Sequence, residues 1–141
     1  MSGKAINISK TTAAHALSYS LTAHYGLPHG HAVALTLPAI FEANAATTDN
    51  DLNDPRGMAY VHTIIRDLCT LLGVDSPTKA TQRIEMLMAI IGLSDTWLSD
   101  HGFDRFEAHN IVMKGVVLER LANNTRRLNR MLIEKIAASI W

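Results

Sequence analysis

The sequence is poor in charge and carries a single cysteine among its 141 residues. Its 13 basic and 13 acidic residues cancel to a formal net charge of +0, so we expect no nucleic-acid partner and no anionic membrane surface. The lone Cys69 falls at an apolar position of a predicted helix, where free cysteines are common. With no second cysteine for a disulfide and no apolar signal segment at the N-terminus, we expect a reducing, cytoplasmic location.

Charged residues are missing altogether between Lys10 and Glu42. A stretch of that length could suggest a membrane span. It contains, however, four histidines, several hydroxyl groups and the helix breakers Gly26, Pro28 and Pro38. These polar groups and breakers argue against a lipid environment. The sequence predicts two helices that are buried on nearly all sides, in part by a partner.

The spacing of apolar residues is helical along almost the whole chain, and no alternating strand pattern occurs. We therefore predict an all-α bundle of about six helices that forms a single domain over residues 1–141. Asp54 is expected to cap a helix that starts at Pro55, and Gly73 to end it. The predicted helices cover residues 9–25, 28–44, 55–72, 77–91, 105–121 and 129–140, with an irregular turn over 97–102.

Two histidines, His15 and His29, are candidate metal ligands. They lie fourteen residues apart, and Gly26 and Pro28 between them prevent one continuous helix. If the two helices fold back as a hairpin, both imidazoles point into one crevice. A purely structural role stays open, because buried helical histidines are more often hydrogen-bonded than metal-bound, and catalytic metals usually take three protein ligands.

Two segments around these histidines, residues 12–19 and 25–38, resemble the signature of the iron-containing (group III) alcohol dehydrogenases. Residues 92–98 and 122–128 are similar to later segments of the same family, so the resemblance spans essentially the whole chain. It implies that His15 and His29 are two ligands of iron(II) or zinc. It also implies the C-terminal part of that family's all-helical metal-binding domain.

The sequence departs from the family in two respects. Tyr19 stands where many members have a second histidine. It could still donate a hydrogen bond to substrate or water, but it is a weak proton relay at neutral pH because its unperturbed pKa is near 10. Family enzymes also carry an upstream nucleotide-binding half, with an aspartate and a third histidine that complete the metal site. No Gly-rich phosphate loop occurs here.

The resemblance implies hydride transfer between NAD(P) and an alcohol or aldehyde, with the metal polarising the substrate oxygen. This chain would supply two ligands and one wall of the substrate pocket, and would be inactive alone. Its expected partner is either a second copy of itself or a separate nucleotide-binding chain.

Lys10, Thr11 and Thr12 form a candidate anion site at the start of the first predicted helix. They combine a cation, two hydroxyls and free backbone N–H groups, which suits an anionic aldehyde. This segment is similar to the branch of the family that acts on phosphonoacetaldehyde, while ordinary helix capping is the alternative.

Two functions follow as hypotheses for the whole chain. The first is the C-terminal part of a metal-dependent alcohol dehydrogenase. The second is a free-standing helical module, derived from that domain and kept for binding or assembly. The related glycerol dehydrogenase and dehydroquinate synthase group is a weaker match, because its members usually show His-Gly-Glu where this chain has His29-Gly30-His31.

Overall fold

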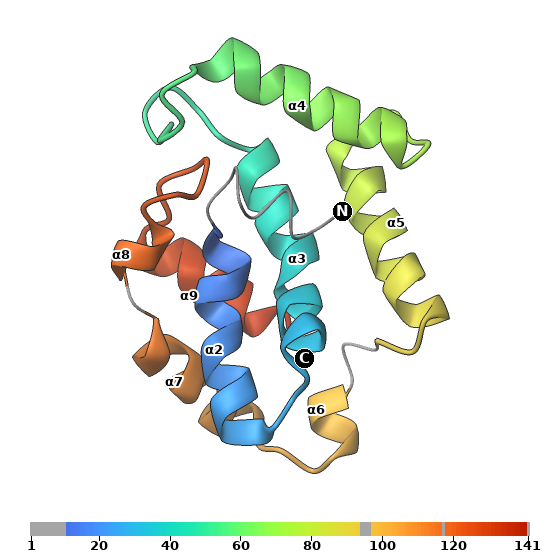
Figure 1. Ribbon diagram of the computed structural model, residues 1–141, viewed down its shortest axis with the longest axis vertical. Helices are drawn as coiled ribbons and strands as arrows, with labels where there is room; N and C mark the ends of the chain where they lie inside the picture. The colour runs from blue at the N-terminus through green and yellow to red at the C-terminus, as the bar shows by residue number, and fades with distance from the viewer. Residues whose placement is uncertain (1–10, 94–96, 117, 141) are drawn as a thin grey trace.

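The computed structural model describes residues 11–93, 97–116 and 118–140, apart from the side chains of Trp97 and Leu118. Within these residues the chain forms eight helices and no strand, which confirms the all-α prediction (Figure 1). The helices are α2 (Ala13–Tyr25), α3 (His29–Ala45), α4 (Met58–Leu71), α5 (Pro77–Ile90), α6 (Trp97–Asp100), α7 (Arg105–Gly115), α8 (Leu118–Leu121) and α9 (Arg130–Ala138). None of them is both long enough and apolar enough to cross a bilayer.

Helices α2 and α3 lie at the centre of the molecule and pack against each other (Figure 1). Helix α7 packs on α2, and α9 contacts both α3 and α7. Helix α5 packs on α3. Helix α4 crosses the end of the bundle at the top of Figure 1 and contacts both α3 and α5. Helix α2, which has no charged residue, and α3, in which Glu42 is the one charged residue, are thus the most enclosed, as their composition predicts.

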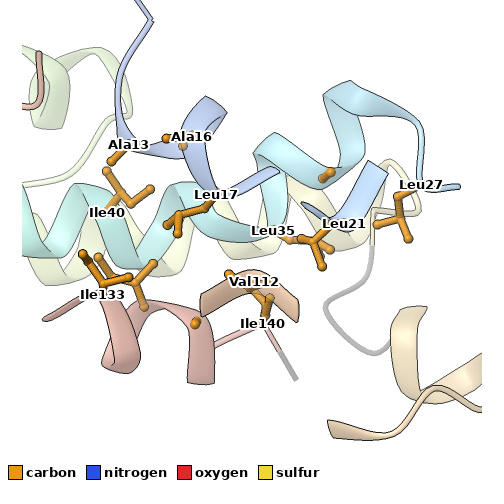
Figure 2. Close-up of a cluster of buried hydrophobic side chains, with 14 of the residues drawn as sticks. Ala13, Ala16, Leu17, Leu21, Leu27, Leu35, Ile40, Val112, Ile133 and Ile140 are labelled. Atoms are coloured by element: carbon orange, nitrogen blue, oxygen red, sulfur yellow. The ribbon is translucent and has the colours of Figure 1, made fainter. Parts of the chain in front are cut away.

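The hydrophobic core fills the space between α2, α3, α7 and α9 (Figure 2). Ile40 lies at the Ala13 end of the α2–α3 contact and Leu35 at the Leu21 end, so the two helices run antiparallel. Each leucine or isoleucine buried in such a core contributes about 1.5–3 kcal/mol. The fully or almost fully buried members include Leu17, Leu21, Leu27, Leu98, Val112, Ile133 and Ile140.

The connection between α2 and α3 decides where His29 lies. Gly26 has a left-handed backbone (φ 67°) and caps α2, with its N–H donating to the carbonyl of Thr22 at 3.1 Å. The chain then runs back alongside α2 before α3 begins (Figure 1). The first residue of α3, His29, lies beside the middle of α2, since its Nδ1 is 3.5 Å from Oγ of Ser18.

The predicted start of the first helix is wrong. Helix α2 begins at Ala13, not at residue 9 or 10, since Thr12 has an extended backbone (φ −119°, ψ −162°) and occupies the N-cap position. Threonine is β-branched and loses side-chain freedom inside a helix, so it favours the cap. Residues 1–10 lie outside the described part of the chain.

The predicted start of the third helix is also wrong, because Asp54 forms a turn and not a cap. Its carboxylate accepts hydrogen bonds from the backbone N–H of Arg56 and from that residue's guanidinium, at 2.7–3.0 Å. Its carbonyl accepts from the N–H of Gly57 at 3.1 Å. Gly57 then takes a positive φ of 88°, and α4 begins only at Met58.

The predicted fifth helix, residues 105–121, is split. Helix α7 ends at Gly115, where Val116 turns to an extended backbone (ψ 114°), and α8 is a separate short helix. Conversely, part of the segment predicted as an irregular turn is the four-residue helix α6. The start of α5 is as predicted, since Ser76 caps it and Pro77 is its first residue.

The segment after α3 is tied to the segment after α8 by buried polar contacts. The side-chain amide of Asn124, 1% exposed, donates to Oδ1 of Asn44 at 2.8 Å. Nε of Arg126 donates to Oδ2 of Asp51 at 2.6 Å. The hydrogen bond from the backbone N–H of Thr48, followed by that from Arg126, holds the pKa of Asp51 below its usual value. These contacts fix α8 and the start of α9 against the rest of the bundle.

Candidate metal and substrate site

The structure brings His15 and His29 together. Their ring centroids lie 5.2 Å apart with an angle of 62° between the planes. His15 is in the first turn of α2 and half-buried, while His29 is the first residue of α3 and exposed. The two imidazoles therefore lie on one face that is open to solvent, as the predicted hairpin requires.

Ser18 and Tyr19 surround this pair. The hydroxyl of the fully buried Ser18 donates to the carbonyl of His15 at 2.9 Å, and its oxygen lies 3.5 Å from Nδ1 of His29. The Tyr19 ring lies 5.6 Å from the His29 ring, and its side chain is 45% exposed. Further along the same face, the hydroxyl of Thr22 is buried and has no hydrogen-bond partner among the described residues. This is the polar face of an otherwise apolar helix.

The pKa of His15 lies below its ordinary value. Partial burial is the main cause, because it disfavours the charged imidazolium, and the neighbouring His29 is the second. A neutral imidazole keeps a lone pair free for a metal ion. His15 is therefore in the protonation state that a ligand needs at neutral pH.

The two imidazoles are of the chemical type that iron(II) and zinc prefer, but two ligands are too few for a catalytic metal site. Imidazole nitrogen suits both ions. In the described part of the chain, however, no group of three or more His, Cys, Asp or Glu side chains could hold a metal ion. Catalytic zinc sites usually take three protein ligands. The pair could supply two ligands, and any others have to come from outside the described residues.

Two further histidines lie on the same two helices as the pair. His24 is exposed in the last turn of α2, and His31 is buried in α3.

Only part of the predicted anion site lies within the described residues. Lys10 lies outside the described residues, and Thr11 is exposed just ahead of α2. The carbonyl of Thr12 accepts from the N–H of Ala16 at 3.2 Å, but its hydroxyl makes no capping hydrogen bond. An anion-binding role for these three residues stays a prediction.

Arg120 of α8 is a site residue that the sequence analysis missed. Its guanidinium carbon lies 4.6 Å from the centre of the Tyr19 ring, within the range of a cation–π contact. Helix α8 packs directly on α2, which brings Arg120 to this face. No local pattern pointed to it, because the contact depends on how two helices far apart in sequence pack together.

The fold and the site together define a class of protein: an all-helical domain that presents two imidazoles from neighbouring helices on an open face. Comparison with known sequences is consistent with this, since the profile for the Fe-containing alcohol dehydrogenase family, C-terminal, matches residues 1–141. The chain belongs to that family, and the resemblance found in the sequence is confirmed.

One curated relative is a phosphonoacetaldehyde reductase from Streptomyces viridochromogenes. It is 35% identical to this chain over 131 residues, which are 92% of this chain and 31% of the relative. The chain therefore spans less than a third of that relative's length. No solved structure matches the chain.

Proposed function

We propose that this chain is the metal- and substrate-binding part of an NAD(P)-dependent enzyme that reduces aldehydes, and that His15 and His29 hold iron(II) or zinc. The observation that carries the proposal is the 5.2 Å approach of the two rings on an open face. Membership of the Fe-containing alcohol dehydrogenase family supports it. The name of the phosphonoacetaldehyde reductase supports an aldehyde as substrate.

A bound metal ion would supply Lewis-acid polarisation of the substrate carbonyl oxygen. Ser18 orients one ligand. Because its single hydroxyl proton goes to the carbonyl of His15, its oxygen is left as an acceptor beside Nδ1 of His29, which favours the tautomer protonated at Nδ1. That contact leaves Nε2 of His29 with its lone pair free for the metal. Tyr19 is exposed beside His29, where its hydroxyl can donate a hydrogen bond to substrate or to water.

The chain alone is proposed to be inactive in hydride transfer. The missing ligands and the NAD(P)-binding half would come from a separate chain, or from a second copy of this one if the protein is a homo-oligomer. Sedimentation equilibrium of the purified chain measures whether it associates with itself. We expect no oxidation of NADH or NADPH above background when it is mixed with acetaldehyde and zinc.

Metal affinity is the direct test of the His pair. We would titrate the metal-free chain with zinc and, under anaerobic conditions, with iron(II), using calorimetry and elemental analysis. The variant His15→Ala/His29→Ala is compared with His24→Ala/His62→Ala, which removes two exposed histidines from α2 and α4. We expect the control to bind like the wild type and the site variant to lose at least tenfold in affinity.

Equal metal binding by both variants would contradict the proposal. No binding by any of the proteins would also contradict it for this chain. The alternative function, a helical module for binding or assembly, would then be the better description. Circular dichroism of each variant establishes that the fold is retained.

A further inference from the structure

We propose that Arg120 binds an oxyanion group of the substrate, so that the site selects short aldehydes that carry a phosphonate or a carboxylate. This inference rests on the proposed function, because it places the substrate at the His15–His29 pair. It adds the class of substrate and the residue that selects it.

Arg120 is linked to the His15–His29 pair through the ring of Tyr19, which contacts both Arg120 and His29. Its guanidinium carbon lies 4.6 Å from the centre of the Tyr19 ring, and the Tyr19 ring lies 5.6 Å from the His29 ring. Because Tyr19 contacts both the guanidinium and the His29 ring, the three groups lie near one another on the face of α2 that carries Tyr19. A short molecule with its carbonyl at the histidines would reach the guanidinium with a group only one or two carbons away.

The guanidinium of Arg120 has no acidic partner among the described residues. The arginines Arg56, Arg126 and Arg130, by contrast, are each paired with a carboxylate at 2.6–2.9 Å. Among the described residues, the guanidinium of Arg120 lies over the face of the Tyr19 ring. Such a contact positions a guanidinium and leaves its N–H donors available. Two of these donors can bind a phosphonate or carboxylate group in a bidentate pair.

The surroundings of Arg120 also favour an anion. No acidic residue occurs between residues 11 and 41, so α2 and the first three turns of α3 contribute no negative charge. Glu119 is adjacent in α8, but side chains at neighbouring helix positions do not face each other. An anion bound at Arg120 would therefore meet no carboxylate from α2.

The test uses the metal-free chain and two probes. Methylphosphonate is the anion, and dimethyl methylphosphonate is its uncharged ester of similar shape. Their dissociation constants are measured by following the ring signals of Tyr19 in an NMR titration, at constant ionic strength. Acetate in place of methylphosphonate tells whether the site prefers a tetrahedral or a planar oxyanion.

We expect Arg120→Ala to weaken methylphosphonate binding at least tenfold. Arg120→Lys should give an intermediate constant, because it keeps the charge and loses the paired donors. The control Arg83→Ala removes an exposed arginine from α5 and should bind like the wild type. The uncharged ester should not bind measurably to any of these proteins.

The inference is overturned if Arg120→Ala binds methylphosphonate as well as the wild type does, or if the ester binds as tightly as the anion. Zinc titration of Arg120→Ala separates this failure from a failure of the proposed function. Zinc binding that is unchanged together with anion binding that is unchanged refutes only the role of Arg120. If the wild type itself does not bind zinc, the metal site is refuted. The methylphosphonate titration then still tests whether Arg120 binds an anion.

Discussion

Ser18 acts on both histidines although it is itself fully buried. It donates to the backbone of one and lies 3.5 Å from a ring nitrogen of the other. In the proposed metal site, such a residue would orient His29 without touching the metal, and residues with this role are worth 10–100-fold in metal affinity in known sites.

We therefore expect Ser18→Ala to weaken zinc binding by about tenfold, since the ring of His29 loses the contact that orients it. Zinc calorimetry measures the effect. The matched control is Ser20→Ala, which removes a buried hydroxyl two residues along the same helix. An equal loss in both variants would assign the effect to packing and not to the orientation of His29.

Asp51 gives a prediction about pH. Its pKa is lowered in the folded protein by the backbone of Thr48 and by Arg126, from an ordinary value of 3.8. A lowered folded-state pKa means a contribution to stability that is present above pH 3.8 and is lost as the pH falls through the folded-state value.

Asp51→Asn should thus lower the free energy of unfolding at pH 7 by about 1–2 kcal/mol, because a charge-assisted hydrogen bond is lost. The difference from the wild type should shrink as the pH falls below about 4. Urea unfolding at several pH values measures it. Asp49→Asn, an exposed change in the same loop, should have the same stability as the wild type within about 0.5 kcal/mol.

At the scale of helices, much of the fold could be predicted from the sequence. The predicted start of α5 at residue 77 is confirmed, and the break between α2 and α3 was located from Gly26 and Pro28, because proline and glycine restrict or free the backbone locally. The start of α4 was missed because Asp54 can either cap a helix or close a turn. Its contacts with Arg56 decide for the turn.

Gly115, the last residue of α7, lies at a tertiary contact that no local pattern reveals. Gly115 packs against Ser20 of α2, so that an added Cβ would overlap the serine Oγ and lie 3.1 Å from its Cβ. The close approach of α7 to α2 requires a residue without a side chain at this point.

Gly115→Ala should therefore destabilise the protein by about 1–3 kcal/mol, as overpacking does. Urea unfolding measures this, and Ser20→Ala in the same molecule should recover part of the loss because the overlap with Oγ disappears. Gly30→Ala is the control. That position in α3 has open space around it and should become about 0.5–1 kcal/mol more stable. A neutral effect of Gly115→Ala would contradict the close packing.

At the scale of the whole molecule, stability depends on the core between α2, α3, α7 and α9 and not on the many apolar residues left outside. Leu17 is fully buried in that core, whereas Leu71 at the end of α4 is 83% exposed. The two leucines are equally apolar in the sequence, and only the packing of the helices distinguishes them.

Leu17→Ala should lower the free energy of unfolding by about 2–5 kcal/mol, because a cavity opens in the core. Leu71→Ala should change it by less than about 0.5 kcal/mol. Thermal and urea unfolding of both variants measure this. Equal losses would mean that Leu71 is covered in solution by another chain, as the predicted partner would require.

The sequence by itself determined the helical class and the family, and it identified His15 and His29 as candidate ligands. Helix periodicity, proline and glycine breaks and a short motif are local properties, so they can be read from the chain. Only the tertiary structure decided that the two rings lie 5.2 Å apart, that Ser18 contacts one of them, and that Arg120 lies on Tyr19. These arrangements depend on the path of the chain after Gly26 and on the packing of α8 against α2. Both are set by burial of side chains from distant segments, which residue spacing along one helix cannot encode.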